Sequence, residues 1–242
     1  MTVYKNLLIT LLSGISAASI ASLPSALFLD NTLSISGSIG YSEFERPTNQ
    51  TLIISNYVTD LLTNSKQHHN ATYNFSVKQQ LNINSNTINK IMLGPTLYFQ
   101  KAHNSGQVWE MFSPEFYNYQ YDMKSKNVNF LLESDVYFKP VTPHITPFLT
   151  AGIGFGVGTM SYNDYALPGI PFDSERHWSM SQTKAIYELG AGLAIPLNSH
   201  LALNLRYAYF YRGKANKYLV QFQSINMNLN NQNVLLGIHY FL

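Results

Sequence analysis

The chain contains no cysteine, which excludes a disulfide framework, a thiolate metal site and a cysteine nucleophile. Charged residues make up only 12% of its 242 residues, whereas about a quarter is usual for soluble domains. There is no run of lysine and arginine and the formal net charge is +2, so we expect no nucleic-acid partner. Beyond the amino-terminal segment, no continuous apolar stretch is long enough to cross a bilayer as a helix. By contrast, aromatic residues are abundant, at 14%.

The first residues have the pattern of a secretory signal peptide. Lys5 supplies the positive charge, "LLITLLSGISAASI" the apolar core, and Ser19 and Ala21 a small-x-small cleavage site. The apolar stretch is shorter than the roughly 20 residues that a membrane anchor needs. We therefore predict a cleaved signal peptide at 1–21 and a single exported domain at 22–242.

Glycine occupies every second position in the middle of "PFLTAGIGFGVGTM", residues 147–160. Ile153, Phe155 and Val157 stand between these glycines, so one face of the segment is bulky and the other nearly bare. A phosphate-binding G-x-G-x-x-G loop is excluded, because Val157 and Thr159 occupy the positions where its third glycine would be needed. The segment is typical of a β-strand whose bare face meets a crowded interior.

The same alternation recurs along the mature chain and predicts eight strands, at 32–44, 72–83, 88–101, 127–139, 148–160, 183–197, 200–212 and 232–242. Each has the roughly 9 to 11 residues that a tilted strand needs to cross a bilayer. Short connections alternate with long ones at 45–71, 102–126, 161–182 and 213–231. A soluble lipocalin-like barrel has no need of four long loops on one rim. We therefore predict an all-β fold, a transmembrane eight-stranded antiparallel up-and-down β-barrel.

The interior of an eight-stranded barrel is only just wide enough for side chains. We expect the small and polar face of each strand to line it, with glycines making room for long polar neighbours. The ionisable residues with this phase form a predicted luminal polar network of Lys78, Lys90, Glu133, Asp135, Glu188, Arg206, Arg212 and His239. Because their charges nearly balance, we expect a paired plug rather than an open pore. Gln79 is a polar residue at a position that the alternation assigns to the apolar outer face. Pro95 and Pro196 are expected to mark strand irregularities or ends.

Aromatic residues gather at strand ends, as expected of rings that favour the lipid headgroup level. The predicted girdle toward the long-loop rim comprises Tyr41, Tyr73, Phe99, Tyr187, Tyr209 and Tyr211. Phe138 and Tyr240 lie toward the opposite rim.

Over roughly its last hundred residues the chain resembles the small outer-membrane barrels of the OmpA, OmpX and opacity-protein kind, through "ITPFLTAGIGFGVG", "IYELGAGLAIPLNSHLALNLRYAYF" and "NVLLGIHYFL". The resemblance implies the outer membrane of a Gram-negative bacterium, with outer-membrane lipid and lipopolysaccharide as surroundings. It also implies a barrel-insertion signal, read by the barrel-assembly machinery, at Gly237, Ile238, Tyr240 and Leu242. Leu242 stands where phenylalanine is usual, and Phe241 is one place out of phase.

The family resemblance implies three possible functions: a structural or surface-recognition protein, a narrow porin for small solutes, or a lipid A-modifying enzyme. We favour the first, acting through the four long loops on host, sugar or lipopolysaccharide partners. The histidines are predicted in loops, in turns or, for His239, in the lumen, so we expect no catalytic residue and no enzyme. Adjacent His68 and His69 are a poor metal-ligand spacing, and no metal or cofactor is expected. The tyrosine-rich segment 116–126 suits either a recognition surface or strands that extend the barrel.

Overall fold

The computed structural model describes residues 32–44, 50–53, 59–68, 70–81, 83, 85–142, 144–170, 176–218 and 224–242. The predicted signal peptide and its cleavage site lie outside these ranges, so they remain predictions. Within the described part of the chain, no helix has both the length and the apolar character to span a membrane.

The described residues form twelve strands and two short 3-10 turns. They are β1 (Leu33–Phe44), β2 (Gln50–Ile53), β3 (Thr59–Gln67), β4 (Ala71–Leu81), β5 (Ile88–Trp109), η3 (Glu110–Phe112), η4 (Pro114–Phe116), β6 (Tyr117–Phe138), β7 (Thr146–Ala166), β8 (His177–Pro196), β9 (Leu201–Tyr211), β10 (Lys214–Tyr218), β11 (Ser224–Asn228) and β12 (Asn231–Phe241).

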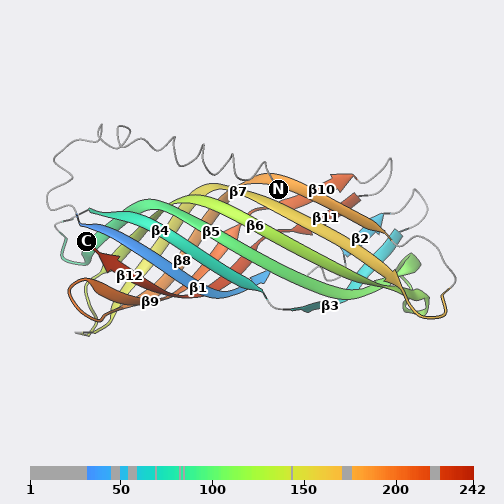
Figure 1. Cartoon of the computed structure of the whole chain (residues 1–242), viewed down its shortest axis with the longest axis horizontal. Coiled ribbons are helices and arrows are strands. Elements are labelled where there is room, and N and C mark those ends of the chain that lie inside the picture. The colour runs from blue at the N-terminus through green and yellow to red at the C-terminus, as the bar shows by residue number, and fades with distance from the viewer. Residues whose placement is uncertain are drawn as a thin grey trace.

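Eight of the strands close into a ring, in the order β1, β4, β5, β6, β7, β8, β9 and β12, with β12 pairing back onto β1 (Figure 1). Every pair in the ring is antiparallel. The predicted eight-stranded barrel is therefore confirmed, and each of its eight strands overlaps the range that the alternation predicted.

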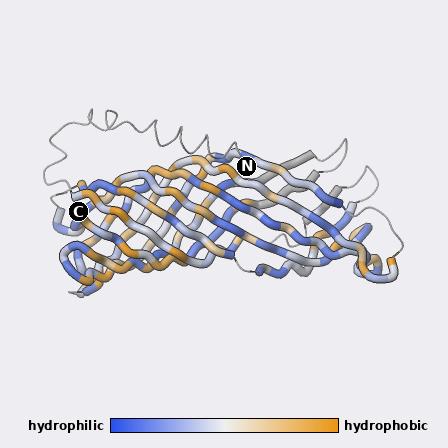
Figure 2. Tube along the Cα trace, in the orientation of Figure 1, coloured by the Kyte–Doolittle hydropathy of each residue, from blue (hydrophilic) through white to orange (hydrophobic). Residues whose placement is uncertain are grey.

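The alternation of apolar residues with small or polar residues along each strand sets which side chains face outward. Apolar residues such as Ile153, Leu189 and Leu236 are about half to two-thirds exposed on the outside, at 56%, 67% and 49%. Figure 2 shows hydrophobic residues concentrated toward the end of the barrel that holds the carboxyl terminus, while hydrophilic residues predominate along the wall toward the other end. An apolar belt over one part of a closed barrel is what contact with hydrocarbon requires.

The bare face of β7 points inward, as expected. A Cβ atom added at Gly152 would lie 2.9 Å from Cγ of Glu133 and 3.3 Å from Oε2 of Glu188. Glycine at this position therefore leaves the space that two buried carboxylates occupy.

The predicted ends of four strands were wrong at the long-loop rim. β5 runs on to Trp109 and β6 begins at Tyr117, and β7 and β8 extend in the same way to Ala166 and from His177. Segment 116–126 thus lies mostly in a strand. The pattern of apolar outward residues did not predict these longer strands because their added outward residues are polar. Their added inward residues, among them Tyr121 and Met123, are apolar and buried.

The other long connections also contain strands. β3 pairs with the distal part of β5, β2 pairs with β3, and β11 joins β2 to β10. Together with the distal parts of β5 to β8 they form a wall that continues the barrel beyond β1, β4, β9 and β12 (Figure 1). We call this part the extension.

Described residues form three apolar clusters in the interior, at successive levels. The short-turn cluster is Met92, Tyr137, Phe148 and Ala194. The middle cluster is Tyr98, Leu131, Ile186, Ala208, Phe210 and Leu235. The extension cluster is Leu62, Val108, Tyr119, Tyr121, Met123, Met160, Tyr162 and Met180. The extension therefore has a packed core of its own.

The two prolines mark irregularities, as predicted. Around Pro95 the ladder between β4 and β5 is interrupted between the pairs Ser76–Thr96 and Gln79–Leu93. Pro196 is the last residue of β8. Gln79, the outward polar residue, stands opposite Leu33 at the first position of β1, so it lies near the rim rather than at mid-wall.

Candidate functional site

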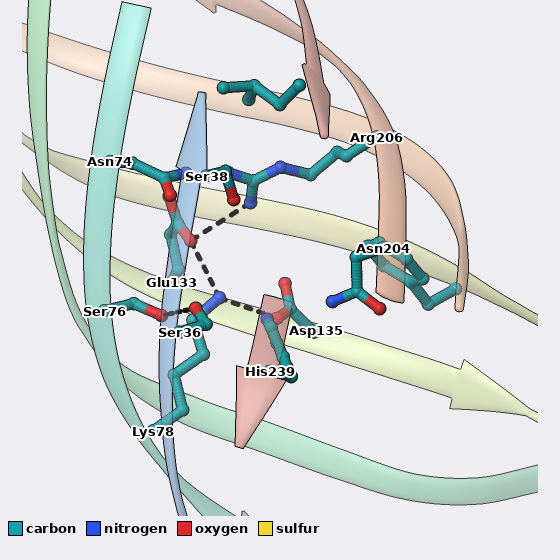
Figure 3. A pocket seen from close by; sticks show the side chains of 12 residues that line it. Ser36, Ser38, Asn74, Ser76, Lys78, Glu133, Asp135, Asn204, Arg206 and His239 are labelled. Atoms are coloured by element: carbon teal, nitrogen blue, oxygen red, sulfur yellow. Dashed lines mark hydrogen bonds and ion pairs between the residues drawn. The ribbon is translucent and has the colours of Figure 1, made fainter. Parts of the chain in front are cut away.

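A buried ion network occupies the barrel between the short-turn and middle clusters (Figure 3). Lys78 Nζ of β4 lies 2.8 Å from Glu133 Oε2 and 2.6 Å from Asp135 Oδ2, both on β6. Arg206 Nη1 of β9 approaches the same Glu133 oxygen at 3.4 Å and Glu188 Oε1 of β8 at 3.7 Å. Two cations and three carboxylates from four strands therefore meet in the lumen.

Neutral donors complete the network. Tyr98 donates its hydroxyl to Glu133 Oε1 at 2.6 Å, and Thr96 donates to Glu133 Oε2 at 2.8 Å. Arg206 in turn donates to the Tyr98 oxygen, and Thr150 donates to Asp135. Because buried charges are tolerated only when paired and hydrogen-bonded, these contacts explain how the carboxylates can stay inside.

Arg212 and His239 of the predicted network are also buried, and Lys90 is half-buried. Arg212 donates to Gln100 and stacks over Phe44 and Phe210. Lys90 lies at the short-turn end, with its ammonium 4.0 Å from the centre of the Phe241 ring.

The interior leaves almost no free space around the network. The cavity lined by Lys78, Glu133, Asp135, Arg206 and His239 has a volume of about 10 Å³, which is at most room for a single water molecule. Apolar clusters lie on both sides of it. At the level of the ion network, side chains therefore fill the lumen.

A second group of polar side chains lies on the outer face, where the extension begins, and sequence reasoning missed it. His68 Nε2 lies 2.7 Å from Ser105 Oγ, and His103 Nε2 contacts Asp122 Oδ1. The two imidazoles stack at 4.5 Å. The sequence feature that could have revealed this group is the H-x-S spacing of His103 and Ser105, which puts both side chains on one face of a strand.

The arrangement differs from a catalytic triad, in which one histidine bridges the nucleophile and the acid. Here Ser105 bonds to one histidine and Asp122 to the other. Among the described residues, no group of three or more histidine, aspartate or glutamate side chains is placed to hold a metal ion.

A buried ion cluster also supports the far end of the extension. Arg176 Nη1 lies 3.0 Å from Asp60 Oδ2, and Arg176 Nε lies 2.6 Å from Asp164 Oδ2. Burial raises the pKa of both carboxyls above the ordinary value, although the neighbouring guanidinium opposes that shift. Burial also raises the pKa of the adjacent Tyr162 hydroxyl. Asp60 further accepts a hydrogen bond from the backbone of Met111, at 3.4 Å, which ties the β5–β6 tip to the cluster.

The aromatic residues of the predicted girdle point outward. Tyr41, Tyr73, Phe99, Tyr187 and Tyr211 are between 42% and 52% exposed, and Tyr209 is 37% exposed. In the closing strand, Ile238 and Tyr240 face outward, while Gly237 is buried. Leu242 follows the end of β12 and is 60% exposed, whereas Phe241 packs against the short-turn cluster. Recognition of these residues by the assembly machinery remains a prediction.

Residues 7–240 match the outer membrane protein beta-barrel domain family. Together with the closed ring and its apolar belt, this match shows that the chain belongs to that family of outer-membrane β-barrels. The predicted fold class and the predicted location in the Gram-negative outer membrane are confirmed.

Solved structures similar to this chain include the outer membrane protease OmpT of Escherichia coli, at 7% identity and a TM-score of 0.54, with 88% of this chain and 97% of that one covered. Ail, the attachment invasion locus protein of Yersinia pestis, matches at 14% identity and a TM-score of 0.41, covering 88% and 100%, in a complex with the heparin analogue sucrose octasulfate. OprG of Pseudomonas aeruginosa matches at 13% identity and a TM-score of 0.44, covering 88% and 95%. No curated protein sequence matches the chain. Because one of these barrels is a protease, the likeness in fold does not assign or exclude catalysis.

Proposed function

We propose that this protein is a non-catalytic surface-recognition barrel, which holds a rigid recognition tip above the outer membrane. The observation that carries the proposal is the β5–β6 tip. There, Met111, Phe112 and Phe116 are 64%, 51% and 48% exposed, far along the extension from the apolar belt. Exposed large apolar side chains beyond the hydrocarbon region are characteristic of interaction sites.

The tip is held in an unfavourable backbone conformation. Met111 and Phe112 have φ angles of 52° and 60°, in the left-handed region that favours glycine. The hydrogen bond from Met111 to Asp60, itself paired with Arg176, helps to fix this conformation. Strain maintained by surrounding contacts is typical of functional sites, because it presents side chains already ordered for binding.

Changing the tip tests the proposal. We expect bacteria that display a Met111→Ser, Phe112→Ser and Phe116→Ser variant to adhere to cultured epithelial cells about ten-fold less than bacteria displaying the unchanged protein, since buried aromatic anchors dominate binding. Val141→Ser, which alters a residue 76% exposed at the short-turn end, is the control and should leave adherence unchanged. Equal adherence of the tip variant would contradict the proposal.

The same cells test the catalytic alternative, which the 2.7 Å contact of Ser105 and His68 favours. A serine with a histidine base could act on an acyl ester of a membrane lipid such as lipid A. Mass spectra of lipid A should be unchanged by the protein. A change that appears with the protein and disappears with Ser105→Ala would establish a lipid-modifying enzyme instead.

Conductance separates the proposal from a narrow porin. Because the ion network and the apolar clusters fill the lumen, we expect the reconstituted protein to add no stepwise current in a planar lipid bilayer. The control is an open porin incorporated under the same conditions. Reproducible single-channel steps with this protein would show that the packed interior opens, and would favour the porin.

A further inference from the structure

Four lysines gather on the outer face of the wall, where the barrel passes into the extension. This lysine patch comprises Lys66 of β3, Lys101 of β5, and Lys124 and Lys126 of β6. All four are exposed. The register places Lys101 directly opposite Lys126, Lys124 opposite His103, and Lys66 opposite Ser105. The patch is therefore a continuous surface across three neighbouring strands.

Three of the four lysine charges of the patch are not balanced by the described part of the protein. Lys124 lies 3.1 Å from Asp122, which also contacts His103. No ion pair or hydrogen bond joins the side chain of Lys66, Lys101 or Lys126 to any residue of the described chain. Like charges directly opposite each other on adjacent strands are destabilising. The repulsion between Lys101 and Lys126 thus favours the binding of an anion from outside the protein.

The level of the patch indicates where that anion resides. Two positions from Lys101 and Lys126 along their strands, toward the short turns, Phe99 and Val128 are paired on the same outer face. Phe99 is 42% exposed and belongs to the aromatic girdle. Two residues of a strand span about 7 Å, so the ammonium groups lie just outside the apolar belt, at the level of lipid headgroups.

The opposite wall differs. At its long-loop rim, the outward residues of β9 and β12 include Tyr209, Tyr211 and Gln232, and none of the described outward side chains on these two strands is a lysine. Tyr207 donates its hydroxyl to Gln232 at 2.8 Å, so polar groups there are paired within the protein. Among the described residues of these two sides, the unpaired lysines thus lie on β3, β5 and β6 and not on β9 and β12.

We propose that the lysine patch is a binding site for the phosphate groups of a phosphorylated lipid in the outer leaflet. One phosphate lies between Lys101 and Lys126 with Lys124 two positions further along β6, Lys66 lies farther out, opposite Ser105, and an acyl chain of the same molecule lies against Phe99 and Val128. Lysine ammonium groups bind phosphate through charge-assisted hydrogen bonds. Clusters of basic residues beside a membrane bind anionic headgroups in this way. The site is independent of the recognition tip, since it uses other residues on another face.

The experiment uses the full mature protein, refolded in a neutral detergent, with diphosphorylated lipid A as the probe and native mass spectrometry to count bound lipid. Lys101→Gln and Lys126→Gln should each weaken lipid binding about five-fold, and the double variant about 25-fold. Lys139→Gln, at an exposed position beyond the other end of β6, is the matched control and should bind as the unchanged protein does. Removal of a repelling charge should leave the variants at least as stable as the unchanged protein in neutral detergent.

Two further probes identify the chemistry. Dephosphorylated lipid A should bind at least 25-fold more weakly, and inorganic phosphate should compete only at far higher concentrations, because it lacks the acyl contact. Equal binding of phosphorylated and dephosphorylated lipid would overturn the phosphate assignment. Equal affinity for inorganic phosphate would overturn the lipid assignment. If Lys139→Gln weakened lipid binding as much as Lys101→Gln does, the binding would reflect general charge attraction rather than a site.

Discussion

Gly154→Ala is expected to prevent formation of the folded barrel. An added Cβ atom would overlap the carbonyl oxygen of Phe130 and lie 2.7 Å from Cα of Leu131. These are backbone atoms of the neighbouring strand, so relief requires β6 and β7 to separate. Backbone shifts forced by overpacking typically cost about 1 to 3 kcal/mol, and we expect a cost above that range here because the backbones of two paired strands must separate. The measurement is the fraction of refolded protein whose gel migration changes on boiling, which should fall close to zero.

Gly158→Ala is the control for this prediction. It lies four residues further along the same strand, and its added Cβ atom would meet only the side-chain amide of Asn127. That amide can rotate away, so we expect normal folding. Similar folding of both variants would mean that the two strands are not held as closely at Gly154 as the structure indicates.

Lys78→Met is expected to lower the free energy of unfolding by about 3 to 5 kcal/mol, because it removes one partner of a buried ion pair. Glu133 would keep only Arg206 as an ionic partner, and Asp135 would lose its 2.6 Å ion pair altogether. The measurement is urea unfolding of the protein refolded in lipid vesicles, with the folded fraction read from gel mobility.

Two variants make the Lys78 result specific. Lys139→Met removes an exposed lysine and should leave the free energy of unfolding within about 0.5 kcal/mol of the original value. Adding Asp135→Asn to Lys78→Met should recover part of the loss, because the carboxylate left without its ion pair is then neutral. Failure of Lys78→Met to destabilise the barrel would show that the network contributes little to the folded state.

The sequence was sufficient to predict the strands wherever one face of a strand meets hydrocarbon and the other meets the barrel interior. In β12, Val234, Leu236 and Ile238 face hydrocarbon while Asn233 and His239 face the interior, so alternation fixed the strand and its phase. The same phase assigned Glu133 and Glu188 to the inner face, and the structure has both buried. The contacts among these groups depend on register between strands far apart in the chain, which one sequence does not supply.

Prediction failed where the outside of the wall turns from lipid to water. His103, Asp122 and Lys124 are outward residues of β5 and β6, but polar residues on an outer face look like a loop to any rule that seeks an apolar stripe. The tip is a different case. Nothing in the residue types of Met111 and Phe112 indicates a left-handed backbone, and the hydrogen bond from Met111 to Asp60 of β3 depends on a contact distant in sequence. Both candidate surfaces outside the barrel therefore became visible only with the strands in place.

The seam between β1 and β12 has a consequence for biogenesis. A hydrogen bond across the seam, from Asn231 to Ser42, joins residues 189 positions apart, so the two strands that seal the cylinder are made at opposite ends of translation. Until β12 arrives, the free edge of β1 is an open template for pairing with other chains. Contacts so distant in sequence form slowly. The nascent polypeptide must therefore be kept from aggregating on its way through the periplasm, and a version cut short before Asn231 would have no means of sealing itself.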